Sequence, residues 1–271
     1  MAINDITLAG GMRGNLVNLQ LVAALQSRTT ERLATGKRVN TAVDDPAAYF
    51  AAASHTSRAS DLAARKDAMG EAIQAVKAAS QGIDAITKLI EQAKGLTAAA
   101  GSANSTDRAS LATQFNALLD QVTFLAKDAG YKGTNFLDSG TLTVSFNETG
   151  TSSLTITGFN ASATGLAISV AAGSWVSDAN VATATAALDT ALTTLRTNAK
   201  TMASNSGVVT TRQEFTTNLI NTLTTGASGL TAADSNEEGA NMLALQTRQQ
   251  LGVVALQLSN QAQQSILRLF G

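Results

Sequence analysis

The chain has 271 residues with a formal net charge of −1, and it contains one histidine, one proline and no cysteine. The lack of cysteine excludes disulfides and thiolate zinc sites, and one histidine leaves little for metal or proton-transfer chemistry, so we expect no enzyme, metal or cofactor. There is no basic run and no apolar stretch near the roughly 20 residues that cross a bilayer, so we also expect neither nucleic acid nor a membrane as a partner.

Residues 1–40 are predicted to form an N-terminal helix. Between residues 12 and 33, apolar side chains recur near one helical face, and residues 1–30 carry only Asp5, Arg13 and Arg28 as charged residues. Gly36 favours the left-handed conformation that closes a helix, so the helix should end near Thr35. A helix with so few charges is expected to bury against protein.

Asp44 and Asp45 precede Pro46, the only proline of the chain. A carboxylate pair is able to serve acid–base chemistry or hold a cation, but no basic or nucleophilic residue is suggested nearby. Either aspartate is also suited to cap the backbone N–H groups of a new helix, with the proline in its first turn. We favour the capping role.

Residues 41–137 and 177–233 are predicted to be rod helices. From Pro46 to about Ala99 a seam of apolar residues repeats every three or four positions, which predicts a helix roughly 80 Å long at about 1.5 Å per residue. After a loop at residues 101–106, Ser105 or Thr106 is expected to cap a third helix that ends near Gly130. Helical spacing returns after Trp175 and continues to about Leu230.

Residues 138–176 differ from the rest because apolar side chains alternate with Thr and Ser. The alternation at Leu142 and Val144, at Leu154 and Ile156, and again from Ile168 to Val170 predicts two to four short strands. We expect a short, surface-exposed β-hairpin region here.

Residues 234–271 are predicted to form a C-terminal helix, with caps supplied by residues 234–238. Its apolar stripe consists of Leu251, Ala255, Leu258, Ala262, Ile266 and Leu269. We therefore expect the two terminal helices to pack against each other or against the terminal helices of other copies of the chain. The order of elements predicts a mainly α fold: a long antiparallel α-helical coiled-coil rod with paired terminal helices and a small β-hairpin region at the distal end.

Two motifs at opposite ends of the chain resemble bacterial flagellin. Residues 32–47 are similar to the stretch that joins the terminal domain of flagellin to its rod domain. The resemblance assigns a domain junction to Arg32, Gly36, Asn40, Asp44, Asp45 and Pro46. Residues 241–243, 249–252, 260–261 and 267–270 look like the C-terminal signature of the family, and residues 133–137 are similar to its turn before the first hairpin.

The resemblance implies a structural role, as the subunit of the bacterial flagellar filament in a short form with core and rod domains only. It implies a homopolymer outside the cell, exported unfolded through the flagellar type III apparatus with an export chaperone and a filament cap as partners. Residues 1–15 lack the features of a cleaved secretory signal, which agrees with that route. The terminal helices would line the filament core, so self-assembly contacts are expected at Leu16, Leu19, Leu33, Leu251, Leu258, Ile266 and Leu269.

Three alternatives remain open at this point. The hook–filament junction protein of the same family shares both terminal signatures and differs in copy number. Some flagellins carry a zinc protease in the central insertion, but the His-Glu-x-x-His helix that this needs is missing here. A secreted coiled-coil adhesin or translocator would also be rich in alanine and helix, but would not need both terminal motifs.

Overall fold

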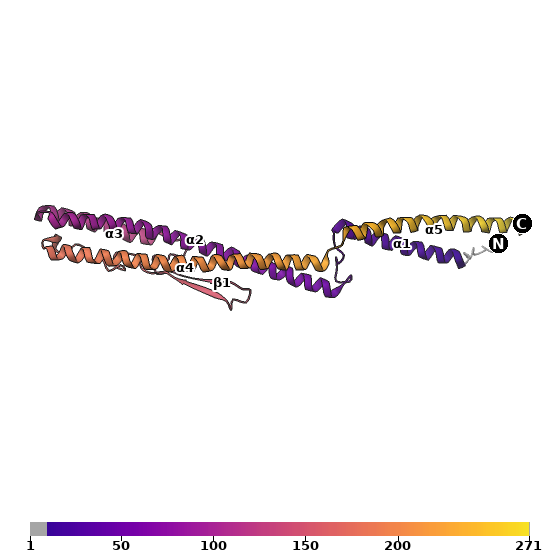
Figure 1. Cartoon of the computed structure of the whole chain (residues 1–271), viewed down its shortest axis with the longest axis horizontal. Coiled ribbons are helices and arrows are strands. Elements are labelled where there is room, and N and C mark those ends of the chain that lie inside the picture. The colour runs from indigo at the N-terminus through magenta and orange to yellow at the C-terminus, as the bar shows by residue number, and fades with distance from the viewer. Residues whose placement is uncertain (1–9, 271) are drawn as a thin grey trace, which may run out of the picture. The chain divides into compact units, whose positions relative to one another are not determined.

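The computed structural model describes residues 10–270, and within them the side chains of residues 11–262, 264 and 265. The described part of the chain has five long helices, which are α1 (Gly10–Thr35), α2 (Pro46–Ser102), α3 (Ser105–Asp128), α4 (Asp178–Thr231) and α5 (Ser235–Phe270) (Figure 1). Between α3 and α4 lie strands β1 (Thr141–Ser145) and β2 (Ser153–Thr157) and the short helix η1 (Ala172–Trp175). The prediction of a mainly α fold with a small antiparallel sheet is confirmed.

The chain divides into two compact units, which we call the terminal unit and the central unit. The terminal unit contains residues 1–56 and 223–271, and the central unit contains residues 57–222. These boundaries fall inside α2 and α4, whereas the predicted domains end near helix ends. None of the helices in the described residues is long and apolar enough to span a membrane.

The helix ends follow local backbone chemistry. Gly36 has a φ of +66° directly after the last residue of α1, as predicted. The cap of α3 differs from the prediction: it is Asn104, whose Oδ1 accepts a hydrogen bond from the backbone N–H of Asp107 at 3.0 Å. Ser105 is instead the first residue of the helix, because α2 continues to Ser102 and leaves a loop of only two residues.

The core of the central unit lies where α2, α3 and α4 pack together. Helix α4 runs antiparallel to α2, since Gln213 donates to the Lys66 carbonyl at 3.3 Å while Lys94 pairs with Asp189 farther along. Fully buried side chains come from all three helices and include Ile86 and Ile90 of α2, Phe115 and Val122 of α3, and Leu188 and Leu195 of α4. The ring of Trp175, also fully buried, lies 4.8 Å from that of Phe115.

Strands β1 and β2 form an antiparallel hairpin, with Leu142 opposite Ile156 and Val144 opposite Leu154. The strand expected from Ile168 to Val170 is absent from the described structure. Ile168 instead donates its backbone N–H to the carbonyl of Ala163 at 2.9 Å, within a series of turns. Ile168 is buried and Val170 is exposed, so these two residues do not share one face as they would in a strand.

The position of the hairpin also differs from the prediction of a distal end. One end of the central unit is marked by the α2–α3 loop and by the ion pair between Arg108 and Asp178 at the start of α4. The hairpin lies away from that end: Glu148 in its loop pairs with Arg58, near the start of the unit. Because α3 is much shorter than α2 and α4, it leaves part of their apolar surface uncovered, and the hairpin covers it with Val144 and Ile156.

Candidate assembly surface

Helices α1 and α5 of the terminal unit pair side by side in antiparallel orientation (Figure 1). The face of α5 that lies against α1 includes the buried Glu238 and Leu245 and, seven residues on, Gly252. A Cβ atom added to Gly252 would lie 2.6 Å from Cδ2 of Leu19, so the two helices approach closely there. This seven-residue spacing is that of a coiled-coil seam. Leu19 therefore lies in the seam between the two helices of one chain.

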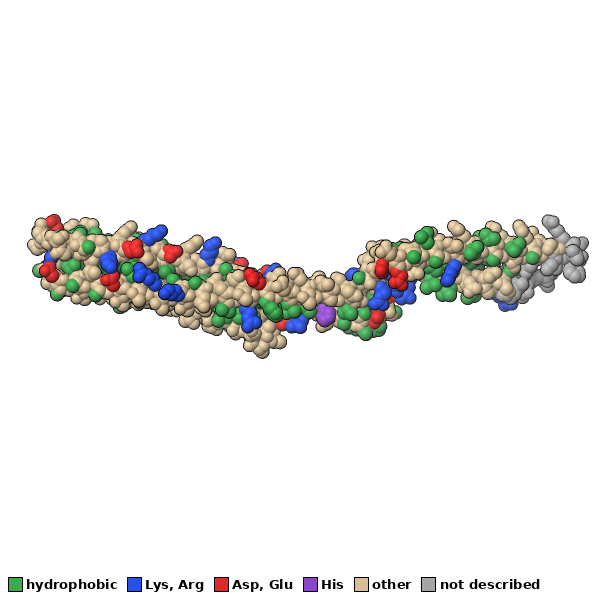
Figure 2. Space-filling view, in the orientation of Figure 1, with side chains coloured by type: hydrophobic (Ala, Val, Ile, Leu, Met, Phe, Trp, Pro, Cys, Tyr) green, Lys and Arg blue, Asp and Glu red, His purple; other side chains and the backbone are tan. Residues whose placement is uncertain are grey.

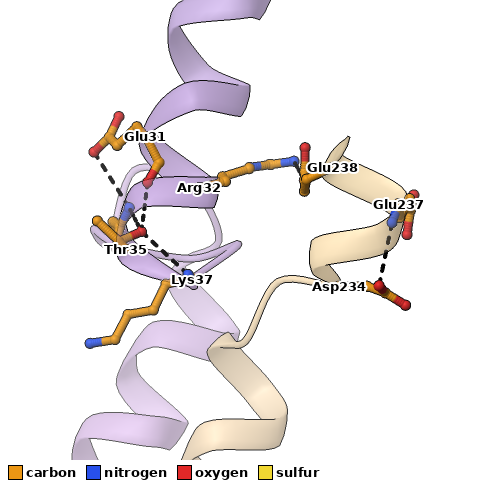
Figure 3. A network of polar contacts seen from close by, with 8 residues as sticks. Glu31, Arg32, Thr35, Lys37, Asp234, Glu237 and Glu238 are labelled. Carbon is orange, nitrogen blue, oxygen red and sulfur yellow. Dashed lines mark hydrogen bonds and ion pairs between the residues drawn. The ribbon is translucent and has the colours of Figure 1, made fainter. Parts of the chain in front are cut away.

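The same seam contains an ion pair between Arg32 of α1 and Glu238 of α5. Figure 3 shows the Arg32 side chain reaching across to Glu238. Arg32 Nη1 lies 2.7 Å from Glu238 Oε1, and the two side chains are only 20% and 7% exposed. Removing one partner from such a pair leaves a charge with little access to water, so the contact links the end of α1 to the start of α5.

The segment after α1 is joined to the α4–α5 connection by backbone hydrogen bonds. Ala233 donates to the carbonyl of Gly36 at 3.0 Å, and Arg38 donates to the carbonyl of Thr231 at 2.7 Å. Val39, the next residue, is almost completely buried. The left-handed conformation at Gly36 therefore turns the chain so that it pairs with the segment between α4 and α5.

Both junction aspartates accept hydrogen bonds from the backbone. Asp45 Oδ1 accepts from the N–H of Ala48 at 3.0 Å, which confirms the predicted cap of α2 with Pro46 as its first residue. Asp44 Oδ2 accepts from the N–H groups of Asn40 and Thr41 at 3.1 and 3.0 Å, and from the Thr41 hydroxyl. These bonds, those from Thr41 above all, hold the pKa of Asp44 below its ordinary value.

The described part of the predicted apolar stripe of α5 is exposed on the side away from α1. Leu251 is 64% exposed and Leu258 is 67% exposed, and on α1 Leu16 and Leu33 are 43% and 38% exposed. Figure 2 shows apolar side chains gathered along the surface of the two helices. Ile266 and Leu269 lie outside the side chains that the structure describes. Large apolar residues at high exposure on two neighbouring helices are typical of an interaction surface.

Further exposed apolar side chains extend this surface beyond the predicted residues. They are Val17, Leu21, Leu243, Val253 and Val254. The predicted stripe did not include them, although Val254 lies between Leu251 and Leu258 at helical spacing. The small number of charged residues in both helices indicates these further contacts, because a helix with few charges has no strongly polar face to expose to solvent. The same reasoning missed Glu238, which is acidic yet buried in the seam.

No group of three or more His, Asp or Glu side chains in the described residues is arranged to hold a metal ion. The surface formed by α1 and α5 instead offers apolar area and backbone-bonded junction residues, which suits binding to protein. Residues 4–141 match the bacterial flagellin N-terminal helical region, and residues 185–270 match the bacterial flagellin C-terminal helical region.

The chain belongs to the flagellin family. It is similar over its full length to flagellin FljM of Caulobacter vibrioides, with 32% identity and all of both chains covered. It is also similar to a flagellin of Brucella melitensis, with 28% identity over 96% of this chain and 99% of the relative. The crystal structure of Bacillus cereus flagellin aligns with a TM-score of 0.47 and 18% identity, covering 54% of this chain and 86% of that one.

This flagellin is a short form, because relatives of the same length are matched from end to end and both family regions are helical core regions. Flagellins are structural proteins that polymerise into the flagellar filament. The family regions and the relatives favour the filament subunit over the hook–filament junction protein and over an adhesin. The chain is accordingly a component of a polymer of the bacterial flagellum.

Proposed function

We propose that this flagellin assembles into the filament through the outward faces of α1 and α5, and that Leu16, Leu33, Leu251 and Leu258 are buried only in the polymer. The observation that supports this most directly is the orientation of α5. The side of α5 that carries Leu245 and Gly252 already packs against α1, while Leu251 and Leu258 face away from α1. The sequence left open whether the terminal helices pair with each other or with other copies, and α5 has a separate face for each.

The energetics favour assembly with many neighbours at once. Burying one leucine contributes about 1.5–3 kcal/mol, whereas association of two molecules costs about 4–15 kcal/mol of lost freedom. A single pair of leucines therefore does not hold two chains together. Contacts between different patches on successive copies do not close on themselves and generate a helical filament.

The proposed division of labour keeps the boundaries expected from the sequence. Residues 1–40 and 234–271 form the assembly core, and residues 41–137 and 177–233 form the rod. Residues 138–176 provide the surface region. Residues 32–46 join core to rod, with Arg32 tied to Glu238 and Asp44 and Asp45 tied to the backbone. Leu19 serves the pairing of α1 with α5, and Ile266 and Leu269 remain part of the proposed assembly stripe.

The remaining partners follow from membership of the family. We propose that the chain leaves the cell unfolded through the flagellar export apparatus, with an export chaperone, and is added beneath a filament cap outside the cell. The absence of cysteine supports this route, because an unfolded chain without thiols forms no disulfides when it reaches an oxidising compartment. The work of the protein is mechanical, and no catalytic role is proposed.

Seeded polymerisation tests the proposal. Purified chain is mixed with short filament fragments and imaged by negative-stain electron microscopy. We expect long filaments of uniform width that grow from the seeds. Short rings would favour the hook–filament junction protein, and persistent monomers under all seeding conditions would contradict assembly through α1 and α5.

A further inference from the structure

A cavity of about 280 Å³ lies between α1 and α5 in the terminal unit. It is lined at one side by Arg28 and Arg32 of α1 and at the other by Arg248 of α5, with Glu238 as the one carboxylate. Thr29 and Asn241 add polar groups to its wall. Three guanidinium groups therefore surround one cavity that contains a single carboxylate.

The charges of this cavity are not balanced by its own residues. Glu238 is paired with Arg32, while neither Arg28 nor Arg248 forms a salt bridge with any side chain that the structure describes. Arg28 and Arg32 are also four residues apart on one helix, where like charges repel each other. Asp44, outside the cavity, attracts Arg28 at longer range, but no salt bridge within the cavity neutralises Arg28 or Arg248.

Arg32 also has an unused hydrogen-bonding edge. Its Nη1 binds Glu238, but its buried Nε has no acceptor in the described structure. Leaving a buried donor without an acceptor is unfavourable, and a negative charge in the adjoining cavity would lessen that cost through its field. Guanidinium groups present N–H pairs that match the spacing of oxygens in phosphates and carboxylates.

We propose that this cavity binds a small oxyanion. Arg28 and Arg248 contact the anion directly, and the charge of Arg32, which Glu238 keeps in place, adds to the positive potential of the cavity. Two arginines without a salt-bridge partner suit an oxyanion such as hydrogen phosphate or sulfate. The bound anion would hold α1 and α5 together beside the Arg32–Glu238 pair. This inference goes beyond the proposed function, since it needs only one chain.

The test is calorimetric titration of the dispersed full-length chain with phosphate at pH 7, with chloride holding the ionic strength constant. We expect one phosphate per chain, and at least tenfold weaker binding for Arg28→Gln and for Arg248→Gln. Arg248→Lys keeps the charge but loses the paired N–H groups, so it should lie between the wild type and Arg248→Gln. Arg196→Gln is the matched control, because it removes an exposed arginine of α4 in the central unit and should bind as the wild type does.

Hydrogen exchange gives a second readout that is local to the site. Phosphate should slow exchange of backbone amides in residues 25–32 and 241–248, and leave α3 unchanged. Titration with acetate and with sulfate identifies the class of oxyanion that the cavity binds. Tighter binding of sulfate and phosphate than of acetate indicates a free dianion, while equally tight binding of acetate indicates a carboxylate. The proposal is overturned if phosphate acts no differently from chloride, or if the Arg28 and Arg248 variants bind phosphate as tightly as the wild type.

Discussion

Replacing Leu258 by aspartate should abolish polymerisation while leaving the single chain folded. Leu258 is 67% exposed and lies on the face of α5 away from α1. A substitution at so exposed a position changes the free energy of unfolding of the dispersed chain by no more than about 0.5 kcal/mol. In the filament the same position is proposed to be buried, where a carboxylate has no partner.

The magnitude follows from burial. Complete burial of a leucine is worth about 1.5–3 kcal/mol, so burying the two thirds of Leu258 that are exposed contributes about 1–2 kcal/mol to assembly. Placing an unpaired carboxylate there costs several kcal/mol more. A total loss above about 3 kcal/mol raises the critical concentration for polymerisation more than roughly 100-fold.

The assay is sedimentation of seeded chain over a range of concentrations, with circular dichroism to show that the variant keeps its helices. Leu258→Asn has nearly the shape of aspartate without its charge, and its critical concentration should rise only about tenfold. Asn260→Asp puts the same carboxylate on another side of α5 and should polymerise at close to the wild-type concentration. Polymerisation of Leu258→Asp at the wild-type critical concentration would refute the assignment of this face to assembly.

Three further predictions concern the terminal unit. Glu238→Gln leaves a poorly solvated guanidinium without its carboxylate, so urea unfolding followed by hydrogen exchange of α1 should show a loss of about 1.5–3 kcal/mol. Gly252→Val brings a Cβ to within 2.6 Å of Leu19 Cδ2 and should destabilise the α1–α5 pair by about 1–3 kcal/mol, whereas Gly239→Ala, with open space around it, should not; equal effects would argue against the close approach. Because the pKa of Asp44 is lowered, its carboxylate stabilises the junction fully at pH values above the ordinary pKa near 3.8, and this stabilisation is lost as the pH falls through the lowered pKa. NMR titration of Asp44 should show the lowered pKa, and Asp44→Asn should remove this pH dependence of stability.

Much of the secondary structure was determined by local sequence. Gly36, Asp45 and Pro46 act through their own backbone and its nearest neighbours, so the end of α1 and the start of α2 were predictable. The long helices were predictable too, because an apolar seam with a spacing of three and four residues over many turns matches the period of a helix and not that of a strand. The cap of α3 was predicted one or two residues too late, since Asn104, Ser105 and Thr106 are all able to cap and the choice depends on where α2 ends.

The tertiary structure decided which surfaces meet. Helix α5 is apolar on more than one side, so its periodicity did not distinguish the face against α1 from the exposed face of Leu251 and Leu258. The close approach of Gly252 to Leu19 and the ion pair between Arg32 and Glu238 identify the face that packs against α1. The hairpin took its position from the surface that the short α3 leaves uncovered, which is a matter of packing. Residues as distant in sequence as Arg28 and Arg248 came to line one cavity only because α1 and α5 run antiparallel. Propensity and capping act over a few residues and are readable from the chain, whereas the pairing of faces is a long-range competition between surfaces of similar composition.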